Sequence, residues 1–288
     1  MPVTLLGASE IRALAAELDL TPTKKLGQNF VVDANTVRKI VQAAEVTSAD
    51  RVVEVGPGLG SLTLAILETG APVTAVEIDH RLAALLPATA AAHGVPGGAL
   101  AVLDADALRV ADLPGDPNVL VANLPYNVSV PVLLHFMETF GGIERGVVMV
   151  QAEVGERLAA PPGSKVYGAP SVKAAWYGPW RLAGTVPRQV FWPVPNVDSV
   201  LVGFHRDPHP RGDETLRRAT FQVVDAAFGQ RRKMLRQALA PLLGGSSAAA
   251  SDALERVGID PTLRGEQLTV DDFVAIARAR ATVASLGE

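Results

Sequence analysis

The feature that most constrains the fold is an alternation of short β-rich runs and helical segments over residues 51–150. The β-rich runs are Arg51–Val55, Val73–Ile78, Leu100–Leu103, Val119–Ala122 and Gly146–Val150. The helical segments between them are Ser61–Glu68, Arg81–Ala92 and Val130–Phe140. Strands that alternate with helices of this length predict an α/β fold, with a mostly parallel sheet covered by helices on both faces.

The segments on either side of this core extend the prediction to the whole chain. Helices are expected at residues 9–18, with Ser9 as N-cap, and after Asp33, which can cap the next one. Beyond residue 150, a short helix (153–159) precedes three further β-like runs, Val172–Tyr177, Leu182–Pro187 and Ser199–Phe204. A break at residues 207–213 (DPHPRGD) then leads into a helical remainder. We therefore expect an α/β domain over residues 1–206 and a small all-helical domain over residues 207–288.

The composition is that of a globular protein without disulfides. Hydrophobic residues make up 48% of the 288 residues and charged residues 19%, which excludes a disordered chain. The mean hydropathy is +0.23, but the most apolar uncharged stretch, 119–137, contains two prolines and two asparagines, so we expect no membrane partner. The absence of cysteine and of a visible secretory signal predicts a cytoplasmic protein.

The charge pattern is informative only locally. The net charge is −4, which gives no global sign of nucleic-acid binding. Residues 229–236 nevertheless contain four cations and no acid, and residues 21–39 contain four cations against one acid. These clusters are either ordinary solvated surfaces or local contacts for a polyanion, and on charge alone the solvated surface is the simpler interpretation.

A glycine-rich turn follows the first β-rich run. Gly56, Gly58 and Gly60 are spaced G-x-G-x-G before a helix, which allows a tight turn and the close approach of a ligand to backbone amides. The third glycine comes one residue earlier than in the G-x-G-x-x-G dinucleotide fingerprint. Glu77, at the end of the next run, can accept hydrogen bonds from both hydroxyls of a ribose. Together these features predict a ribose-containing cofactor.

The most specific motif is Asn123-Leu124-Pro125-Tyr126, at the end of the fourth run. The motif suits methyl transfer to the exocyclic amine of adenine. This amine is a poor nucleophile, because its lone pair is delocalised into the ring. Two acceptors on its N–H bonds, the Asn123 side-chain oxygen and the Leu124 carbonyl, can aim that lone pair at a methyl group, and Tyr126 offers a ring for stacking. This chemistry requires no metal, and the five histidines show no ligand spacing.

The glycine-rich turn with Glu77 resembles the class I S-adenosylmethionine-dependent methyltransferases. The N-L-P-Y motif narrows the resemblance to the ribosomal RNA adenine N6-dimethyltransferases. Segments 24–30 (KKLGQNF), 191–199 (FWPVPNVDS) and 230–233 (QRRK) also resemble that family, and the resemblance covers about residues 20–268. It implies a Rossmann-like α/β sheet with a small helical domain, and S-adenosyl-L-methionine as the cofactor.

The same resemblance implies roles for individual residues. The implied cofactor contacts are Asn29, the backbone of Val31, Gly56, Gly58, Glu77, Asp106 and Asn123. Asp104 is an alternative to Asp106, although Asp106-Ala107-Leu108 matches the family pattern better, and Val31 stands where the family usually has Leu. Glu54 is expected to brace the glycine loop through backbone amides rather than to touch the ligand.

The implied RNA contacts lie in two places. The catalytic residues are expected to be Asn123, Leu124, Tyr126 and Phe191. Phe191 would face the target adenine opposite Tyr126, with a core aromatic as the alternative interpretation. Arg231, Arg232 and Lys233 would contact phosphates. If a helix runs through residues 228–239, these three cations span about 300° of its circumference, so one of them must face away from the RNA.

The resemblance also implies a substrate. It points to two adjacent adenines in the 3′-terminal hairpin of 16S ribosomal RNA, methylated by a monomer within the immature small subunit. The first alternative is a resistance-type methyltransferase of large-subunit RNA, but that branch commonly has Ile in place of Leu124 and typically lacks the V-D-S segment. The others are a ribosome-assembly factor with secondary catalysis and a nicotinamide-dependent oxidoreductase. The spacing of Gly60 and the N-L-P-Y motif argue against the oxidoreductase.

Overall fold

The computed structural model describes residues 2–20, 29–125 and 128–285, and only the backbone from residue 281 onward. The chain divides into two compact units. The first consists of Met1–Gly155 and Trp180–Arg206, and the second of Glu156–Pro179 and Asp207–Glu288. Residues 156–179 were expected within the first domain, but they group with the second unit. One reason is that the Tyr167 hydroxyl donates a hydrogen bond to the Leu268 carbonyl at 2.8 Å.

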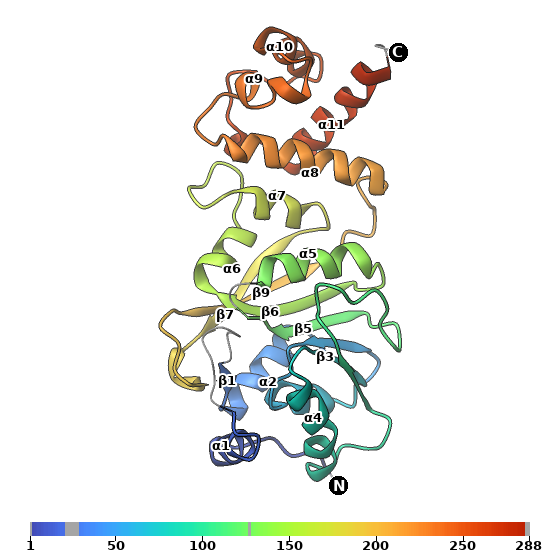
Figure 1. Ribbon diagram of the computed structural model, residues 1–288, viewed down its shortest axis with the longest axis vertical. Coiled ribbons are helices and arrows are strands. Elements are labelled where there is room, and N and C mark those ends of the chain that lie inside the picture. The colour runs from blue at the N-terminus through green and yellow to red at the C-terminus, as the bar shows by residue number, and fades with distance from the viewer. Residues whose placement is uncertain (1, 21–28, 126–127, 286–288) are drawn as a thin grey trace. The chain divides into compact units, whose positions relative to one another are not determined.

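The first unit contains a seven-stranded sheet in the order β4-β3-β2-β5-β6-β9-β7 (Figure 1). Its strands are β2 (Val52–Val55), β3 (Val73–Glu77), β4 (Leu100–Asp104), β5 (Val119–Asn123), β6 (Arg145–Gln151), β7 (Trp180–Val186) and β9 (Ser199–His205). The five strands from β2 to β6 run parallel, whereas β9 is antiparallel to both of its neighbours. The predicted α/β fold with a mostly parallel sheet is confirmed.

Helices precede and separate these strands at the predicted positions. They are α1 (Ala8–Glu17), α2 (Ala34–Ala43), α3 (Ser61–Leu67), α4 (His80–Ala92), α5 (Ser129–Thr139) and α6 (Ala152–Leu158). The Asp33 side chain caps α2 by accepting a hydrogen bond from the Thr36 amide at 2.7 Å, as predicted. Ser9 does not cap α1. That helix begins one residue earlier, after Gly7, whose amide donates to the Glu10 carboxylate at 2.8 Å.

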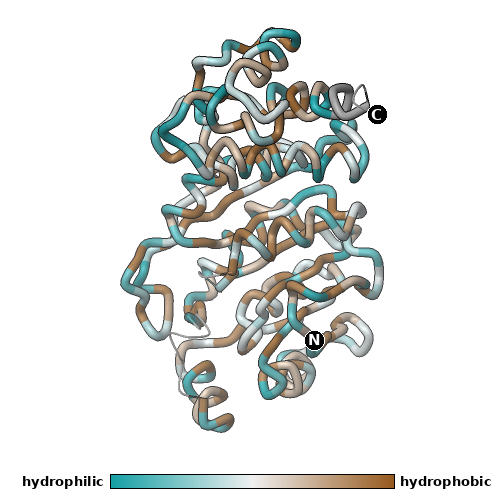
Figure 2. The backbone as a smooth tube through the Cα atoms, turned by 45° about the horizontal axis from the view of Figure 1, so that its top comes forward, coloured by the Kyte–Doolittle hydropathy of each residue, from teal (hydrophilic) through white to brown (hydrophobic). Residues whose placement is uncertain are grey.

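The core of the first unit lies along the sheet, whose strands are largely hydrophobic (Figure 2). All residues of β2 and β3 are buried. A separate two-stranded antiparallel ribbon pairs β1 (Phe30–Val31) with β8 (Phe191–Trp192), which follows the short 3-10 helix η2 (Arg188–Val190). In the register of this ribbon, Val31 lies opposite Phe191.

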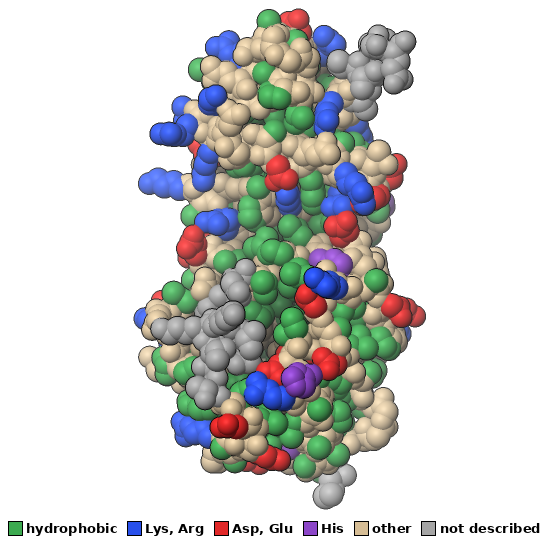
Figure 3. All heavy atoms as spheres, viewed as in Figure 1, with side chains coloured by type: hydrophobic (Ala, Val, Ile, Leu, Met, Phe, Trp, Pro, Cys, Tyr) green, Lys and Arg blue, Asp and Glu red, His purple; other side chains and the backbone are tan. Residues whose placement is uncertain are grey.

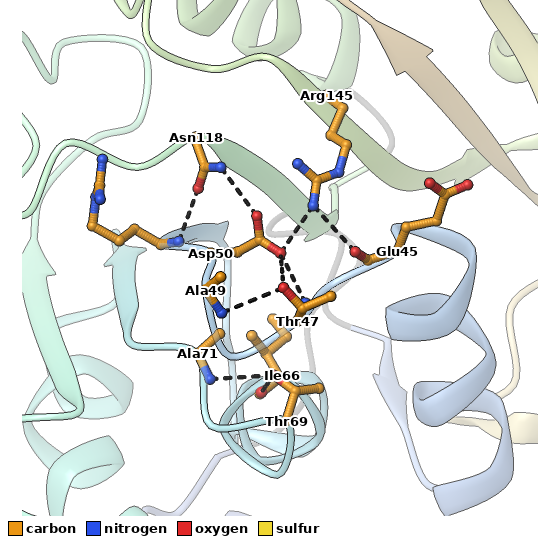
Figure 4. Close-up of polar contacts among 10 residues, drawn as sticks. Glu45, Thr47, Ala49, Asp50, Ile66, Thr69, Ala71, Asn118 and Arg145 are labelled. Carbon is orange, nitrogen blue, oxygen red and sulfur yellow. Dashed lines mark hydrogen bonds and ion pairs between the residues drawn. The ribbon is translucent and has the colours of Figure 1, made fainter.

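The amino ends of β2, β5 and β6 are joined by a polar network around Asp50 (Figure 4). The Asp50 carboxylate accepts hydrogen bonds from the Thr47 amide at 2.8 Å, Asn118 Nδ2 at 3.0 Å and Arg145 at 2.9 Å. Asn118 directly precedes β5, and Arg145 is the first residue of β6. The network therefore ties three strands together at the end of the sheet opposite their carboxyl termini.

The described part of the second unit is helical. Its helices are α7 (Ala169–Ala175), α8 (Glu214–Gly229), α9 (Leu235–Ala238), α10 (Ser247–Glu255) and α11 (Val270–Ser285), with 3-10 turns η3 (Ala240–Leu242) and η4 (Gly265–Gln267). The β-like run predicted at 172–177 is wrong, because α7 begins at Ala169, after its N-cap Gly168, and has Pro170 in its first turn. Across the described residues of both units, no helix is long and apolar enough to cross a membrane.

Candidate functional site

A cavity of about 290 Å³ opens in the first unit, at the carboxyl ends of β2, β3 and β5. It lies where the strand order reverses, the usual position of ligand sites in such sheets. All seven predicted cofactor residues line it, namely Asn29, Val31, Gly56, Gly58, Glu77, Asp106 and Asn123. Asp104, the alternative to Asp106, is not among the lining residues.

The glycine turn brings backbone close to the cavity. Gly58 has a φ of +57°, and a Cβ added to it would lie 2.9 Å from the Phe30 ring. Its amide donates a hydrogen bond to Glu77 Oε2 at 3.0 Å. A side chain at position 58 would therefore strain the turn and displace Phe30 from the cavity wall.

Glu77 is positioned by two backbone donors. It is 6% exposed, and its second oxygen, Oε1, accepts from the Asp79 amide at 3.0 Å. Burial raises the pKa of Glu77, and the amides of Asp79 and Gly58 counteract the rise. Each carboxylate oxygen can accept a second hydrogen bond. The side chain thus presents two fixed acceptors to a ligand in the cavity.

Glu54, on the neighbouring strand β2, is placed differently from the prediction. It is 1% exposed and lines the cavity, and within the described part of the chain its Oε2 has no hydrogen-bond partner. It is therefore not bracing the glycine loop through that oxygen. Burial raises the pKa of Glu54 to about 8, with Thr63 opposing the rise and the charge of Glu77 adding to it. The carboxyl group is mostly protonated at neutral pH.

Asn123 is held at the edge of the cavity by a residue far away in sequence. Its Nδ2 donates a hydrogen bond to the main-chain carbonyl of Asn29 at 3.1 Å. The next residue, Leu124, is 1% exposed, and its amide donates to the Met149 carbonyl at 3.1 Å, which extends the pairing of β5 with β6. Pro125 also lines the cavity. The predicted stacking residue Tyr126 lies outside the described residues.

Phe191 is placed in the core. It is 2% exposed, belongs to the main hydrophobic cluster with Val31, and is not among the residues that line the cavity. This position supports the alternative interpretation, packing, and an adenine could stack on the ring only after neighbouring side chains move. The adjacent Trp192 is stacked on Phe30, with ring centroids 6.3 Å apart.

The apolar walls of the cavity were not predicted from the sequence. Phe30, Ile78 and Leu108 line it, and residues Ile78 and Leu108 are 60% and 38% exposed. The available signal was their place in the sequence, since Ile78 directly follows Glu77 and Leu108 follows Asp106 by two residues. Apolar residues left exposed beside polar acceptors are typical of a site that holds a planar, partly apolar ligand.

The three basic residues of the second unit do not lie on a helix. Helix α8 ends at Gly229 and α9 begins at Leu235, so the expected helix through 228–239 is wrong. Arg231 bonds within the unit, to Glu266 at 2.9 Å and to the Lys165 carbonyl at 2.8 Å. Arg232 and Lys233 are exposed and form no ion pair with another described residue. Figure 3 shows several Lys and Arg side chains along one margin of this unit.

Lys24 and Lys25, in the second basic cluster, lie outside the described residues. Among the residues that are described, no group of three or more histidine, aspartate or glutamate side chains could hold a metal ion.

Comparison with known proteins decides the family. The sequence pattern of the family described as "Ribosomal RNA adenine dimethylase" matches residues 20–281. The chain belongs to this family. A relative from Leifsonia xyli subsp. xyli, "Ribosomal RNA small subunit methyltransferase A", is 64% identical over 95% of this chain and 98% of its own. The protein of that name from Streptomyces coelicolor is 60% identical over 96% of this chain and 97% of its own.

A solved structure agrees on the fold of this adenine dimethylase. A dimethyladenosine transferase from Plasmodium falciparum superposes with a TM-score of 0.73, at 24% identity, over 85% of this chain and 94% of its own. The chain is an S-adenosylmethionine-dependent methyltransferase that acts on ribosomal RNA.

The cavity fits the cofactor of this adenine dimethylase. When bound, S-adenosylmethionine supplies a methyl group activated by the positive charge of its sulfonium. Glu77 has two fixed acceptor oxygens that suit the hydroxyls of a ribose, and the exposed apolar residues Ile78 and Leu108 suit contact with a base. Glu54 Oε2 and Ser61 Oγ are buried polar atoms without a partner in the described part of the chain, and both residues line the cavity. A polar ligand would satisfy such atoms.

Proposed function

We propose that this chain dimethylates N6 of two adjacent adenines in the 3′-terminal hairpin of 16S ribosomal RNA, within the immature small subunit. The proposal is supported by the likeness to small-subunit methyltransferases, which extends over nearly the full length of both chains. The structural observation behind it is the position of Asn123, at the edge of the cofactor cavity with its amide nitrogen already bonded to Asn29.

The proposed chemistry follows from that position. With Nδ2 occupied, Asn123 Oδ1 is the acceptor for one N–H of the adenine amine, and the Leu124 carbonyl is the acceptor for the other. Two such bonds localise the nitrogen lone pair and aim it at the methyl group. This orientation lowers the barrier to methyl transfer. Tyr126 stacks on the base, and the amine proton leaves to solvent after transfer.

The remaining roles are divided between the two units. Cofactor binding is assigned to Asn29, Val31, Gly56, Gly58, Glu77, Asp106 and Asn123. Phosphate contact is assigned to Arg232 and Lys233 in the second unit, with Arg231 holding the turn from which they project. We further propose that the protein acts as a monomer in the cytoplasm, where ribosomal subunits assemble.

The test uses ribosomal subunits from a strain that lacks the modification. Purified protein and labelled S-adenosylmethionine are incubated with immature small subunits and, separately, with large subunits, and the modified bases are identified by mass spectrometry. We expect two adjacent N6,N6-dimethyladenosines in each small-subunit RNA and none in the large-subunit RNA. Transfer to the large subunit, or to a single small-subunit adenine, would refute the proposed substrate.

A further inference from the structure

The hydrogen bond between Asn123 and Asn29 determines which end of the Asn123 amide faces the substrate. Only the nitrogen end of a side-chain amide can donate to a carbonyl, and Nδ2 lies 3.1 Å from the Asn29 oxygen. The flipped amide would place two acceptor oxygens against each other. The bond therefore leaves Oδ1 as the side-chain polar atom of Asn123 that can contact a substrate. Both residues line the cavity.

The Asn29 carbonyl is itself held in place. Asn29 directly precedes β1, which pairs with β8 in a defined register, Phe30 with Trp192 and Val31 with Phe191. One residue further on, the Val32 amide donates to the Val190 carbonyl at 2.8 Å. Phe30 and Val31 are buried at 7% and 4% exposure. The carbonyl thus lies at the entry to a packed ribbon whose residues Phe30 and Val31 line the cavity.

We propose that the main-chain carbonyl of Asn29 is a positioning group for methyl transfer, which locks the Asn123 amide in the orientation that presents Oδ1 to the target amine. The inference rests on the proposed function, because it assigns to Asn29 a role in orienting the acceptor of that reaction. It adds to the cofactor role of the Asn29 side chain a separate role for the backbone of the same residue.

The variant Asn123→Asp shows whether the Asn29 carbonyl positions residue 123. A positioning role and the absence of one predict opposite changes of activity with pH. In the variant Asn123→Asp, a protonated carboxyl can donate its O–H to the Asn29 carbonyl and still accept from the amine, as the amide does. An ionised carboxylate has no donor and would face the carbonyl oxygen with negative charge. If the Asn29 carbonyl had no role, the ionised form would be the stronger acceptor for the amine.

The nearby acids affect the pKa of this variant but not the sign of the test. Glu54, Glu77 and Asp106 line the same cavity. The negative charges of Glu77 and Asp106, and that of Glu54 once it ionises, would raise the pKa of a carboxylate introduced there. The proposal concerns which protonation state is active, and the value of the pKa only sets where the change occurs. Dividing the activity of the variant by that of the wild type at each pH removes the titration of groups common to both.

The experiment measures single-turnover methylation of small subunits at saturating cofactor from pH 5.5 to 8.5. For Asn123→Asp we expect a ratio to wild type that is highest at the acidic end and falls by about tenfold per pH unit above the apparent pKa. The matched variant Asn29→Ala/Asn123→Asp keeps the carbonyl and removes the Asn29 side chain, so its profile should fall in the same way. A ratio that stays constant or rises with pH overturns the proposal, as does a folded, cofactor-binding variant that is inactive even at pH 5.5.

The wild-type protein gives an independent measurement. In its ¹⁵N spectrum, the Asn123 side-chain amide should show slowed hydrogen exchange, because its nitrogen donates to the Asn29 carbonyl. A freely exchanging side-chain amide would overturn the proposal, even if Asn123→Asp failed to fold. Failure of the proposed function is a different result, in which the wild type itself transfers no methyl group to small subunits.

Discussion

Two buried carboxyls on neighbouring strands line the same cavity and differ in the donors around them. Glu77 accepts two backbone amides at 3.0 Å each, whereas Glu54 Oε2 has no partner in the described part of the chain. Both pKa values are raised by burial. Glu77 therefore has fixed acceptors for neutral hydroxyls. The ionised form of Glu54 would be stabilised by a hydrogen-bond donor or a positive charge that the ligand supplies.

Replacing Glu77 should weaken cofactor binding. Glu77→Ala removes two acceptors for the ribose and should cost about 2–3 kcal/mol, or roughly 30- to 160-fold in Kd. Glu77→Gln keeps one acceptor oxygen and should lie between the alanine variant and wild type. Isothermal titration calorimetry with S-adenosylmethionine measures all three proteins, and circular dichroism checks their folding. Unchanged affinity in folded Glu77→Ala would remove Glu77 from the cofactor site.

Replacing Glu54 should stabilise the ligand-free protein above pH 5. Its folded-state pKa of about 8 lies above the ordinary value of 4.5, so ionisation in the unfolded state favours unfolding as the pH rises between these values. The free energy of unfolding of Glu54→Gln should exceed that of wild type by a margin that grows by up to about 1.4 kcal/mol per pH unit and levels off above pH 8. Urea unfolding at pH 5, 6.5 and 8 measures the margin.

A matched variant shows the opposite sign. Glu68 forms an exposed ion pair with Arg38, and its hydrogen bond to that residue lowers its pKa. Its stabilising effect is complete above the ordinary pKa, so Glu68→Gln should be slightly less stable than wild type by a constant amount from pH 5 to 8. A margin for Glu54→Gln that is equally constant would contradict a raised pKa at Glu54.

At the scale of elements, strongly periodic segments were predictable and short ones were not. The five parallel strands and the helices between them follow from the alternation of apolar runs, which packing on a sheet requires. Residues 172–177 form a short apolar run that suits a strand or a buried helix equally well, and its position next to α8 decides for the helix. The turn at Arg231–Lys233 could not be predicted, because three cations occur as readily in a turn as on a helix.

The candidate site was predictable only in part: its residues followed from motifs, but their long-range contacts did not. Glu77 and Asn123 follow from motif positions at strand ends, which parallel strands bring to one edge of the sheet. The bond of Asn123 to Asn29 spans 94 positions in sequence and depends on how β1 is placed against β5. No local pattern encodes that placement, and for the same reason the burial of Phe191 could not be read from its motif.

The network at the opposite end of the sheet should act on stability alone. Burial would raise the pKa of Asp50, but the bonds from Thr47, Arg145 and Asn118 outweigh it and lower the pKa. Asp50→Ala removes the carboxylate partner of the largely buried Arg145, which keeps its bond to the Glu45 carbonyl at 3.1 Å, and should cost about 3 kcal/mol. Wild type should lose this contribution only as the pH falls below about 4, through the lowered pKa.

Chemical denaturation at pH 7 measures the effect of Asp50→Ala, and calorimetry measures cofactor affinity at a temperature where the variant is folded. Affinity should be unchanged, because Asp50 is not among the residues that line the cavity. Asp50→Asn retains acceptors for Thr47 and Arg145 and should lose less stability than alanine. A loss below 1 kcal/mol for Asp50→Ala would show that the network contributes little.

At the scale of the whole molecule, a net charge of −4 means that RNA affinity cannot come from a uniform positive field. It must come from local clusters, and the structure separates the cations of the densest one. Arg231 bonds to Glu266 and to the Lys165 carbonyl, whereas Arg232 and Lys233 are exposed without a described ion-pair partner. The first contributes to the turn, and the other two are available for phosphates.

Salt dependence tests this division. Each phosphate contact contributes about 0.7–0.9 to the slope of log affinity against log salt concentration. Arg232→Ala/Lys233→Ala should therefore make the slope for small subunits less steep by about 1.4–1.8. Cofactor affinity should stay unchanged, because neither residue lines the cavity. Arg231→Ala is the matched control, which should keep the slope and lose about 1 kcal/mol or less of stability, as expected for an exposed ion pair. Titrations of the three proteins from 50 to about 300 mM salt give the slopes.

An unchanged slope in the double variant would make these residues an ordinary solvated surface, and RNA contact would then have to come from other cations. An equal fall for Arg231→Ala would mean that its bonds to Glu266 and Lys165 break when RNA binds.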